Sequence, residues 1–94
     1  MSPHTLLVID DDEEIRSLLT EYFTKANFRV LSLPDGEHLL TTLKQESVDL
    51  VILDVMLPGD DGFTLCRKAR QVSAVPIIML TAASDESDKV IGLE

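Results

Sequence analysis

The chain has 94 residues and a formal charge of −9, from eight basic and seventeen acidic side chains. This length suits one domain and is too short for two, because single-core domains usually contain about 100–150 residues. The negative charge repels nucleic acid and anionic membrane surfaces, so we expect neither DNA binding by this segment nor membrane association. The apolar stretches are also far shorter than the roughly 18 residues that a transmembrane helix requires.

The cysteine and histidine residues argue against a disulfide-stabilised secreted protein and against a metal site built from cysteine and histidine. The single cysteine, Cys66, cannot form an internal disulfide, and no basic segment followed by a long apolar run opens the chain. Both features predict a cytoplasmic protein. His4 and His38 have no metal-ligand spacing with Cys66, so they are expected at the surface.

The first half of the chain predicts strands alternating with helices. The apolar run 6–9 predicts a buried strand, and it ends in three acidic residues, Asp10, Asp11 and Asp12. Asp11 or Asp12 is expected to cap the following helix, which Asn27 ends. The helix spacing predicts one inward face, formed by Ile15, Leu18, Leu19, Tyr22 and Phe23.

The next elements continue the alternation. Residues 28–33 predict a second strand, closed by the turn sequence 34–36. A second helix is expected to face the core through its leucines, Leu39, Leu40 and Leu43. Residues 48–53 predict a third strand, and their nearly uninterrupted apolar character is typical of a parallel sheet covered on both faces.

After a loop at 57–62, residues 63–71 predict a third helix, with Phe63, Cys66 and Ala69 facing inward. Residues 76–80 predict a fourth strand. From Asp85 the pattern predicts a fourth helix that carries Val90, Ile91 and Leu93. Four strands alternating with four helices indicate an α/β fold, a doubly wound parallel sheet with right-handed crossovers.

Oxygen-bearing side chains occur where three of these strands end. Asp10 and Asp11 follow the first strand, Asp54 follows the third, and Thr81 and Ala82 follow the fourth. Ligands of open α/β sheets bind at the carboxyl ends of the strands. Crowded carboxylates are tolerated mainly where a cation binds, and oxygen ligands favour Mg²⁺. The sequence therefore predicts a magnesium site at this edge.

Each residue also has a simpler explanation. The acidic run could be only a helix cap, Asp54 only a carboxylate at a strand end, and Thr81 only a residue with a local backbone hydrogen bond. The functional interpretation is favoured because it alone explains why all three strand ends carry oxygen ligands.

The segments 7–12, 53–62 and 76–82 closely resemble the three signature blocks of response-regulator receiver domains, which have a CheY-like, flavodoxin-like fold. Their separations also fit, with 43 positions from Asp11 to Asp54 and 27 from Asp54 to Thr81. The resemblance runs from about Thr5 to Glu94. The Met-Leu-Pro-Gly sequence and residues 88–94 look most similar to the OmpR/PhoB subfamily, whose full-length members carry a C-terminal winged-helix DNA-binding domain.

The resemblance implies roles for individual residues. Asp54 would accept a phosphoryl group from a sensor histidine kinase. Asp11 and Asp54, with the backbone carbonyl of Met56, would ligate Mg²⁺ directly, and Asp10 would act largely through water. Thr81 would be the switch hydroxyl, and Ala82 the small residue that leaves room for the phosphoryl group.

The chain also departs from the family. Residues 1–94 are expected to form one receiver domain without the fifth strand, its lysine and aromatic residue, the fifth helix or an output domain. Lys89 is expected in the fourth helix, where it could not replace that lysine. Residues 76–80 would then form an unpaired sheet edge, which predicts a homodimer through the fourth strand and fourth helix.

Three functions remain open from the sequence. The leading one is a phosphorylatable signalling module without an external substrate to turn over, so not an enzyme. An aspartyl-phosphate phosphatase would need a general acid two positions after Asp54, where Met56 stands. A truncated module without signalling activity, which only mediates association, is the third. The four glycines match no nucleotide-binding loop.

Overall fold

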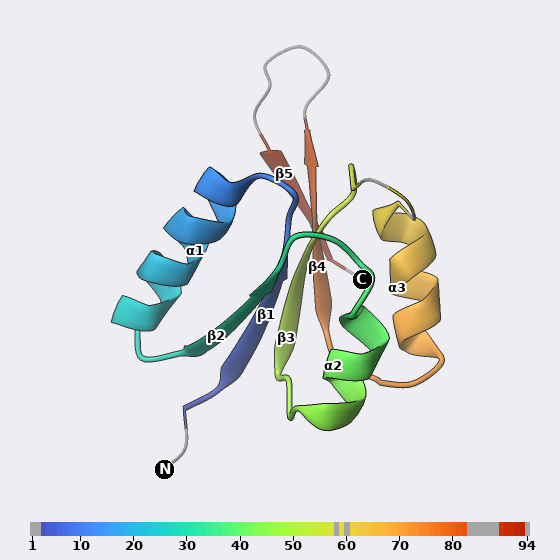
Figure 1. Ribbon diagram of the computed structural model, residues 1–94, viewed down its shortest axis with the longest axis horizontal. Helices are drawn as coiled ribbons and strands as arrows, with labels where there is room; N and C mark the ends of the chain where they lie inside the picture. Colours follow the sequence, from blue (N-terminus) through green and yellow to red (C-terminus); the bar gives the residue numbers. More distant parts are fainter. Residues whose placement is uncertain (1–2, 58, 60, 83–88, 94) are drawn as a thin grey trace.

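The computed structural model describes residues 3–57, 59, 61–82 and 89–93, with side chains up to Leu80. Strands and helices alternate along the chain (Figure 1). In chain order the elements are β1 (Thr5–Ile9), α1 (Glu13–Lys25), β2 (Arg29–Leu33), α2 (Leu39–Gln45), β3 (Leu50–Asp54), α3 (Gly62–Arg70), β4 (Ile77–Ala82) and β5 (Lys89–Leu93). The predicted α/β fold is confirmed.

The strands form one sheet in the order β2-β1-β3-β4-β5. The neighbours from β2 to β4 are parallel, and β5 is antiparallel to β4. Ile9 pairs with Leu53, and Asp54 pairs with Leu80. The carboxyl ends of β1, β3 and β4 therefore lie at the same edge of the sheet.

The core has one layer on each face of the sheet. The larger layer packs under α2 and α3 and takes alternate residues of the central strands, among them Leu7, Ile9, Val51, Leu53, Ile77 and Met79. The smaller layer lies on the α1 side and contains Val8, Ile52 and Leu80. Because both faces are covered, the central strands are apolar at nearly every position before their carboxyl ends, as the sequence indicated.

Helix α1 begins and ends where the sequence predicts. The Asp12 side chain accepts hydrogen bonds from the backbone N–H groups of Glu14 and Ile15, at 2.9 and 3.4 Å. Asn27 has a φ of 71°, a left-handed conformation that asparagine tolerates well, and it turns the chain toward β2.

The inward face of α1 is narrower than predicted. Leu18 and Tyr22 are 67% and 68% exposed, so their predicted burial is wrong. Leu19 and Phe23 pack against the sheet instead. Leu18 and Tyr22 each precede one of these residues by one position, which turns them about 100° around the helix and away from the strands.

Helix α3 begins one residue earlier than predicted, and its inward face differs accordingly. Leu65, Cys66 and Ala69 are buried, whereas Phe63 is 50% exposed. The prediction is therefore right for Cys66 and Ala69 and wrong for Phe63. A hydrogen bond of 2.8 Å from the backbone N–H of Thr64 to the Asp61 side chain caps the helix.

This cap predicts a pH dependence of stability. The hydrogen bond from the Thr64 backbone lowers the pKa of Asp61 from its ordinary value of 3.8. A lowered pKa stabilises the fold above the unfolded-state value, and this stabilisation is lost as the pH falls through the folded-state value. Asparagine also caps helices but carries no charge. We expect Asp61→Asn to unfold more easily than the wild type at neutral pH, with the difference shrinking as the pH falls below 3.8 toward the lowered folded-state pKa.

Urea unfolding between neutral pH and roughly pH 3 measures this difference. Asp61→Ala is the control, because it removes the capping acceptor at every pH. A gap between the asparagine variant and the wild type that stays constant with pH would contradict the prediction.

The chain after β4 differs most from the prediction. Residues 83–88 lie outside the described part of the chain. Lys89–Leu93 was predicted to be helical, but it forms β5, with Ala82 opposite Lys89 and Ile78 opposite Leu93. Val90 and Ile91 are β-branched residues, which favour strands. Pairing with β5 also satisfies backbone hydrogen-bonding groups of β4 that would otherwise lie at an open edge.

Strand β5 occupies the edge of β4 on which the predicted dimer depends. The predicted association required an open edge on β4 and a fourth helix with an uncovered apolar face. β4 pairs with β5 from Ile78 to Ala82, and residues 89–93 are a strand. Self-association stays a prediction, but an open β4 edge does not support it.

In the described residues, no helix has the length and apolar character needed to cross a membrane.

Candidate functional site

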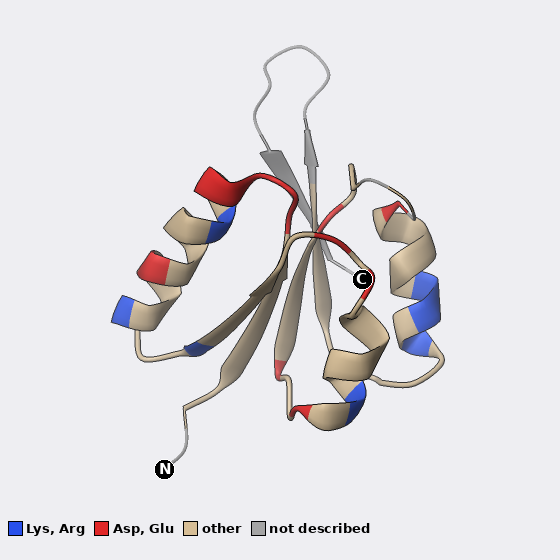
Figure 2. Ribbon diagram, viewed as in Figure 1, with Lys and Arg blue, Asp and Glu red and all other residues tan. Residues whose placement is uncertain are grey.

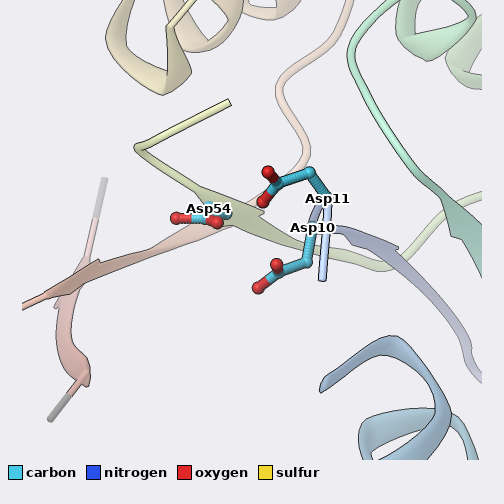
Figure 3. A group of neighbouring side chains, drawn as sticks. All are labelled: Asp10, Asp11 and Asp54. Carbon is cyan, nitrogen blue, oxygen red and sulfur yellow. The ribbon is translucent and has the colours of Figure 1, made fainter. Parts of the chain in front are cut away.

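Three carboxylates meet at the carboxyl edge of the sheet. Asp10 follows β1 directly, Asp11 comes next, and Asp54 is the last residue of β3. One ligand oxygen from each lies within 4.8 Å of the others, and Figure 3 shows the three side chains side by side. Acidic residues gather at this end of the molecule (Figure 2). The structure therefore brings together the three aspartates that the sequence selected.

Asp10 is fixed on three sides. Its backbone N–H donates to the carbonyl of Leu33 at 3.2 Å, which extends the pairing of β1 with β2 by one residue. Its Oδ1 accepts the N–H of Asp12 at 2.9 Å, and its carbonyl accepts Nη1 of Arg16 at 2.7 Å. The Asp10 residue is fully buried. This carboxylate has a defined position rather than a solvated surface one.

Asp54 is equally constrained. It is only 3% exposed, and its Oδ1 accepts the N–H of Met56 at 3.0 Å. The next residue, Val55, donates to the carbonyl of Leu80 on β4 and accepts the N–H of Gly62, at 3.0 and 2.9 Å. The chain therefore stays attached to the sheet and to the start of α3 just after Asp54.

Asp11 completes the cluster from the exposed side. It is exposed, whereas Asp10 and Asp54 are buried. Two buried like charges repel each other strongly, and removing them from water is costly unless a counter-charge is present. Carboxylate oxygens at this spacing suit a hard divalent cation that keeps some of its water, and Mg²⁺ is such an ion. The exposed side at Asp11 offers that water a route.

The other predicted site residues are Met56, Thr81 and Ala82, and the structure describes only part of their geometry. The Met56 side chain is 71% exposed, and its N–H binds Asp54; its carbonyl stays a predicted ligand. Thr81 and Ala82 are the last two residues of β4, just beyond Leu80, which pairs with Asp54. Their backbones therefore lie at the correct edge, while their side chains are outside the described part. His4 and His38 are exposed, as predicted, and Cys66 is buried.

Two residues at the site were not found from the sequence. Arg16 reaches back from the first turn of α1 to the carbonyl of Asp10. Gly62 lies so close to β3 that a Cβ there would be 2.8 Å from the carbonyl oxygen of Asp54. No spacing pattern signals either contact, although a glycine at the start of a helix hints at a close approach of backbones.

The fold and this cluster define a class of protein, in which an open α/β sheet carries a group of carboxylates at the carboxyl ends of its strands. The model of the response regulator receiver domain family matches residues 6–94. The chain belongs to this family. Its Asp10, Asp11 and Asp54 are the acidic positions that the resemblance selected.

Curated relatives support the same assignment. The chain is 52% identical over 93 residues to the transcriptional regulatory protein GltR of Pseudomonas aeruginosa, a match that covers 96% of the chain and 38% of that protein. It is 39% identical over 89 residues to the transcriptional regulatory protein BaeR of Escherichia coli, covering 95% of the chain and 37% of that protein. The chain thus spans less than two fifths of the length of these relatives.

Solved structures share the fold. The BeF₃-activated receiver domain of RstA from Klebsiella pneumoniae matches with a TM-score of 0.80 and 36% identity, over 88% of this chain and 71% of that one. The response regulator TrrA from Thermotoga maritima, solved in complex with Mg²⁺ and beryllofluoride, matches with a TM-score of 0.79 and 34% identity, over 89% and 77%.

Proposed function

We propose that this receiver domain is switched by phosphorylation of Asp54 in a reaction that requires Mg²⁺. The observation that carries the proposal is the carboxylate cluster, in which ligand oxygens of Asp10, Asp11 and Asp54 lie within 4.8 Å of one another. A related response regulator, TrrA, is described as bound to Mg²⁺ and beryllofluoride. Beryllofluoride resembles a phosphoryl group, so the same chemistry suits this site.

The phosphoryl donor is a phosphohistidine of a sensor kinase. A carboxylate oxygen of Asp54 attacks the phosphorus, a P–O bond forms, the P–N bond breaks, and the departing imidazole nitrogen takes up a proton. Bound Mg²⁺ would neutralise charge on the phosphoryl oxygens during transfer. Asp11 and Asp54, with the Met56 carbonyl, would hold the ion, and Asp10 would act through water.

The chain's own residues position the nucleophile. The N–H of Met56 and the β3 backbone orient Asp54, and its location at the end of a rigid strand limits its motion. Correct placement of reacting groups is the main source of catalysis in phosphoryl transfer. Thr81 would then move its hydroxyl toward the new phosphoryl group, with Ala82 leaving space for it.

The output of this switch is transcription. The relatives are named as transcriptional regulators, and the chain spans less than two fifths of their length. We therefore assign DNA binding to an output domain outside these 94 residues, and only phosphoryl acceptance to this domain. A cytoplasmic location suits both partners and the single buried thiol. No external substrate is turned over, so the domain is a signalling module rather than an enzyme.

A small phosphodonor tests this function. Acetyl phosphate with Mg²⁺ should add one phosphoryl group to the intact protein, on the peptide that contains Asp54. Asp61→Asn is the matched control and should label normally, since Asp61 caps α3. Mass mapping that places the group on Asp60 or Asp61 would refute the assignment. Labelling that is equally fast in EDTA would remove the metal from the proposal.

A further inference from the structure

We infer that Arg16 is a positioning residue for the metal site: it holds the end of β1 so that Asp10 and Asp11 keep the geometry that a divalent cation needs. The inference rests on the proposed function, because it concerns the same carboxylates. The observation behind it is the hydrogen bond of 2.7 Å from Nη1 of Arg16 to the backbone carbonyl of Asp10.

The location of this contact matters because it lies at the junction between the two acidic ligands. The carbonyl of Asp10 belongs to the peptide group that joins it to Asp11. Rotation of this peptide group would swing Asp11, the exposed member of the cluster, away from Asp54. A donor on that carbonyl therefore restricts the rotation that would take the cluster apart.

Arg16 is itself well anchored. Its backbone N–H donates to the carbonyl of Asp12 at 3.0 Å, within the first turn of α1. The side chain is half-buried and runs back toward the strand. Arg16 thus links the helix to the strand end, while Asp12 links the same two elements through its N–H bond to Asp10 Oδ1. The loop between β1 and α1 is closed by both bonds.

The charge of Arg16 adds a second effect. The guanidinium donates to a carbonyl rather than to a carboxylate, so it brings a positive charge to the cluster without occupying a ligand oxygen. The carboxylate oxygens therefore stay available to a divalent cation, and the guanidinium eases the repulsion between the aspartates in the metal-free fold. Outer contacts of this kind orient metal ligands and commonly change metal affinity by 10–100-fold when removed.

Mg²⁺ titration by calorimetry tests this role without any phosphorylation. We expect Arg16→Ala to weaken Mg²⁺ binding roughly tenfold. Arg29→Ala is the matched control, because it removes the same residue type from the opposite end of the sheet, where Arg29 pairs with Thr5. This control should bind Mg²⁺ within about twofold of the wild type. Equal affinities in the two variants would overturn the inference.

Two longer side chains cover the case in which Arg16→Ala does not fold. Arg16→Lys keeps a donor at the end of a long stem, and Arg16→Gln has a shorter stem, so its amide falls short of the Asp10 carbonyl. We expect the lysine variant to bind Mg²⁺ nearly as well as the wild type and the glutamine variant to bind it more weakly. A glutamine variant that binds Mg²⁺ as tightly as the wild type would contradict the inference.

Hydrogen exchange gives a readout that is independent of the metal. The amide of Asp12, which donates to Asp10 Oδ1, should exchange faster in Arg16→Ala while the amides of β3 stay protected. Uniformly faster exchange would show a general loss of stability and would overturn the local role. Failure of the wild type to bind Mg²⁺ would instead refute the metal site in the proposed function.

Discussion

Asp54→Asn should abolish phosphoryl acceptance and, in the absence of metal, make the fold more stable. The Asp54 carboxylate is 3% exposed, and its ligand oxygen lies within 4.8 Å of those of Asp10 and Asp11. At an effective dielectric constant near 20, such a pair of like charges repels by about 3 kcal/mol. We therefore expect the substitution to raise the free energy of unfolding by on the order of 1–3 kcal/mol.

Asparagine suits this position for geometric reasons as well. It has the shape of aspartate, so the core around β3 is not disturbed. Its amide oxygen can still accept the N–H of Met56, and its NH₂ group can donate to the neighbouring carboxylates. The variant therefore loses the repulsion and keeps the hydrogen bond.

Mg²⁺ should narrow this difference in stability. A ligand at ten times its Kd stabilises the folded state by about 1.4 kcal/mol, provided that it does not bind the unfolded chain. The wild type should gain this stabilisation, and the variant, which lacks one ligand charge, should gain much less. Urea unfolding with and without Mg²⁺ measures both effects on the same samples.

Asp49→Asn is the matched control. Asp49 accepts a backbone N–H, from Thr5 at 2.7 Å, but it lies at the opposite end of the sheet and its side chain is 50% exposed. The control should show no gain in stability and should respond to Mg²⁺ like the wild type. If Asp54→Asn lowers stability without metal, or responds fully to Mg²⁺, the carboxylate cluster does not act as we describe.

The sequence predicts the site well because parallel topology alone brings strand ends together. Once 6–9 and 48–53 are recognised as buried parallel strands, Asp10 and Asp54 must lie at the same edge. The observed register places Ile9 beside Leu53, so the residues that follow them are neighbours. The close approach of the carboxylates follows from hydrophobic pattern and order along the chain.

Predictions that depend on tertiary context were less successful. The helix pattern predicts that Phe63 faces inward because it is apolar. The face of α3 that points inward depends on how the helix packs from its first residue, Gly62, and this packing leaves Phe63 exposed. Residues 89–93 are short and apolar, and periodicity alone does not distinguish a strand from a helix in such a segment. Pairing with β4 decides in favour of the strand.

The contact of Arg16 could not be predicted for a different reason. It joins a side chain to a backbone carbonyl six residues earlier, across the loop between β1 and α1. Such a contact depends on the angle at which the helix leaves the strand, and the hydrophobic pattern carries no information on that angle. The same holds for the close approach of Gly62 to β3.

Gly62→Ala should cost at least about 2 kcal/mol of stability and impair phosphoryl acceptance. A Cβ at this position would lie 2.6 Å from Cα of Val55 and 2.8 Å from the carbonyl oxygen of Asp54. Both contacts are with backbone, so no flexible side chain can move aside. Either α3 shifts outward or the chain after Asp54 is displaced, and the hydrogen bond from the Gly62 N–H to the Val55 carbonyl is strained in both cases.

The displacement should reach the reaction because Asp54 immediately precedes the clash. A shift of about 1 Å in a reacting group can reduce a rate roughly 100-fold. We therefore expect acetyl phosphate to label Gly62→Ala at least about tenfold more slowly than the wild type, at a temperature where both proteins are folded. Urea unfolding gives the loss of stability, and intact mass against time gives the rate.

Gly59→Ala separates this effect from a general loss of stability. Gly59 lies in the same loop with a φ of 80°, and a Cβ there would meet no atom within 4 Å. Alanine in this left-handed conformation costs about 1–2 kcal/mol, but nothing pushes on β3. The control should therefore lose stability and keep its labelling rate. Equal labelling rates in the two alanine variants would show that the close packing of Gly62 supports only the fold and does not position Asp54.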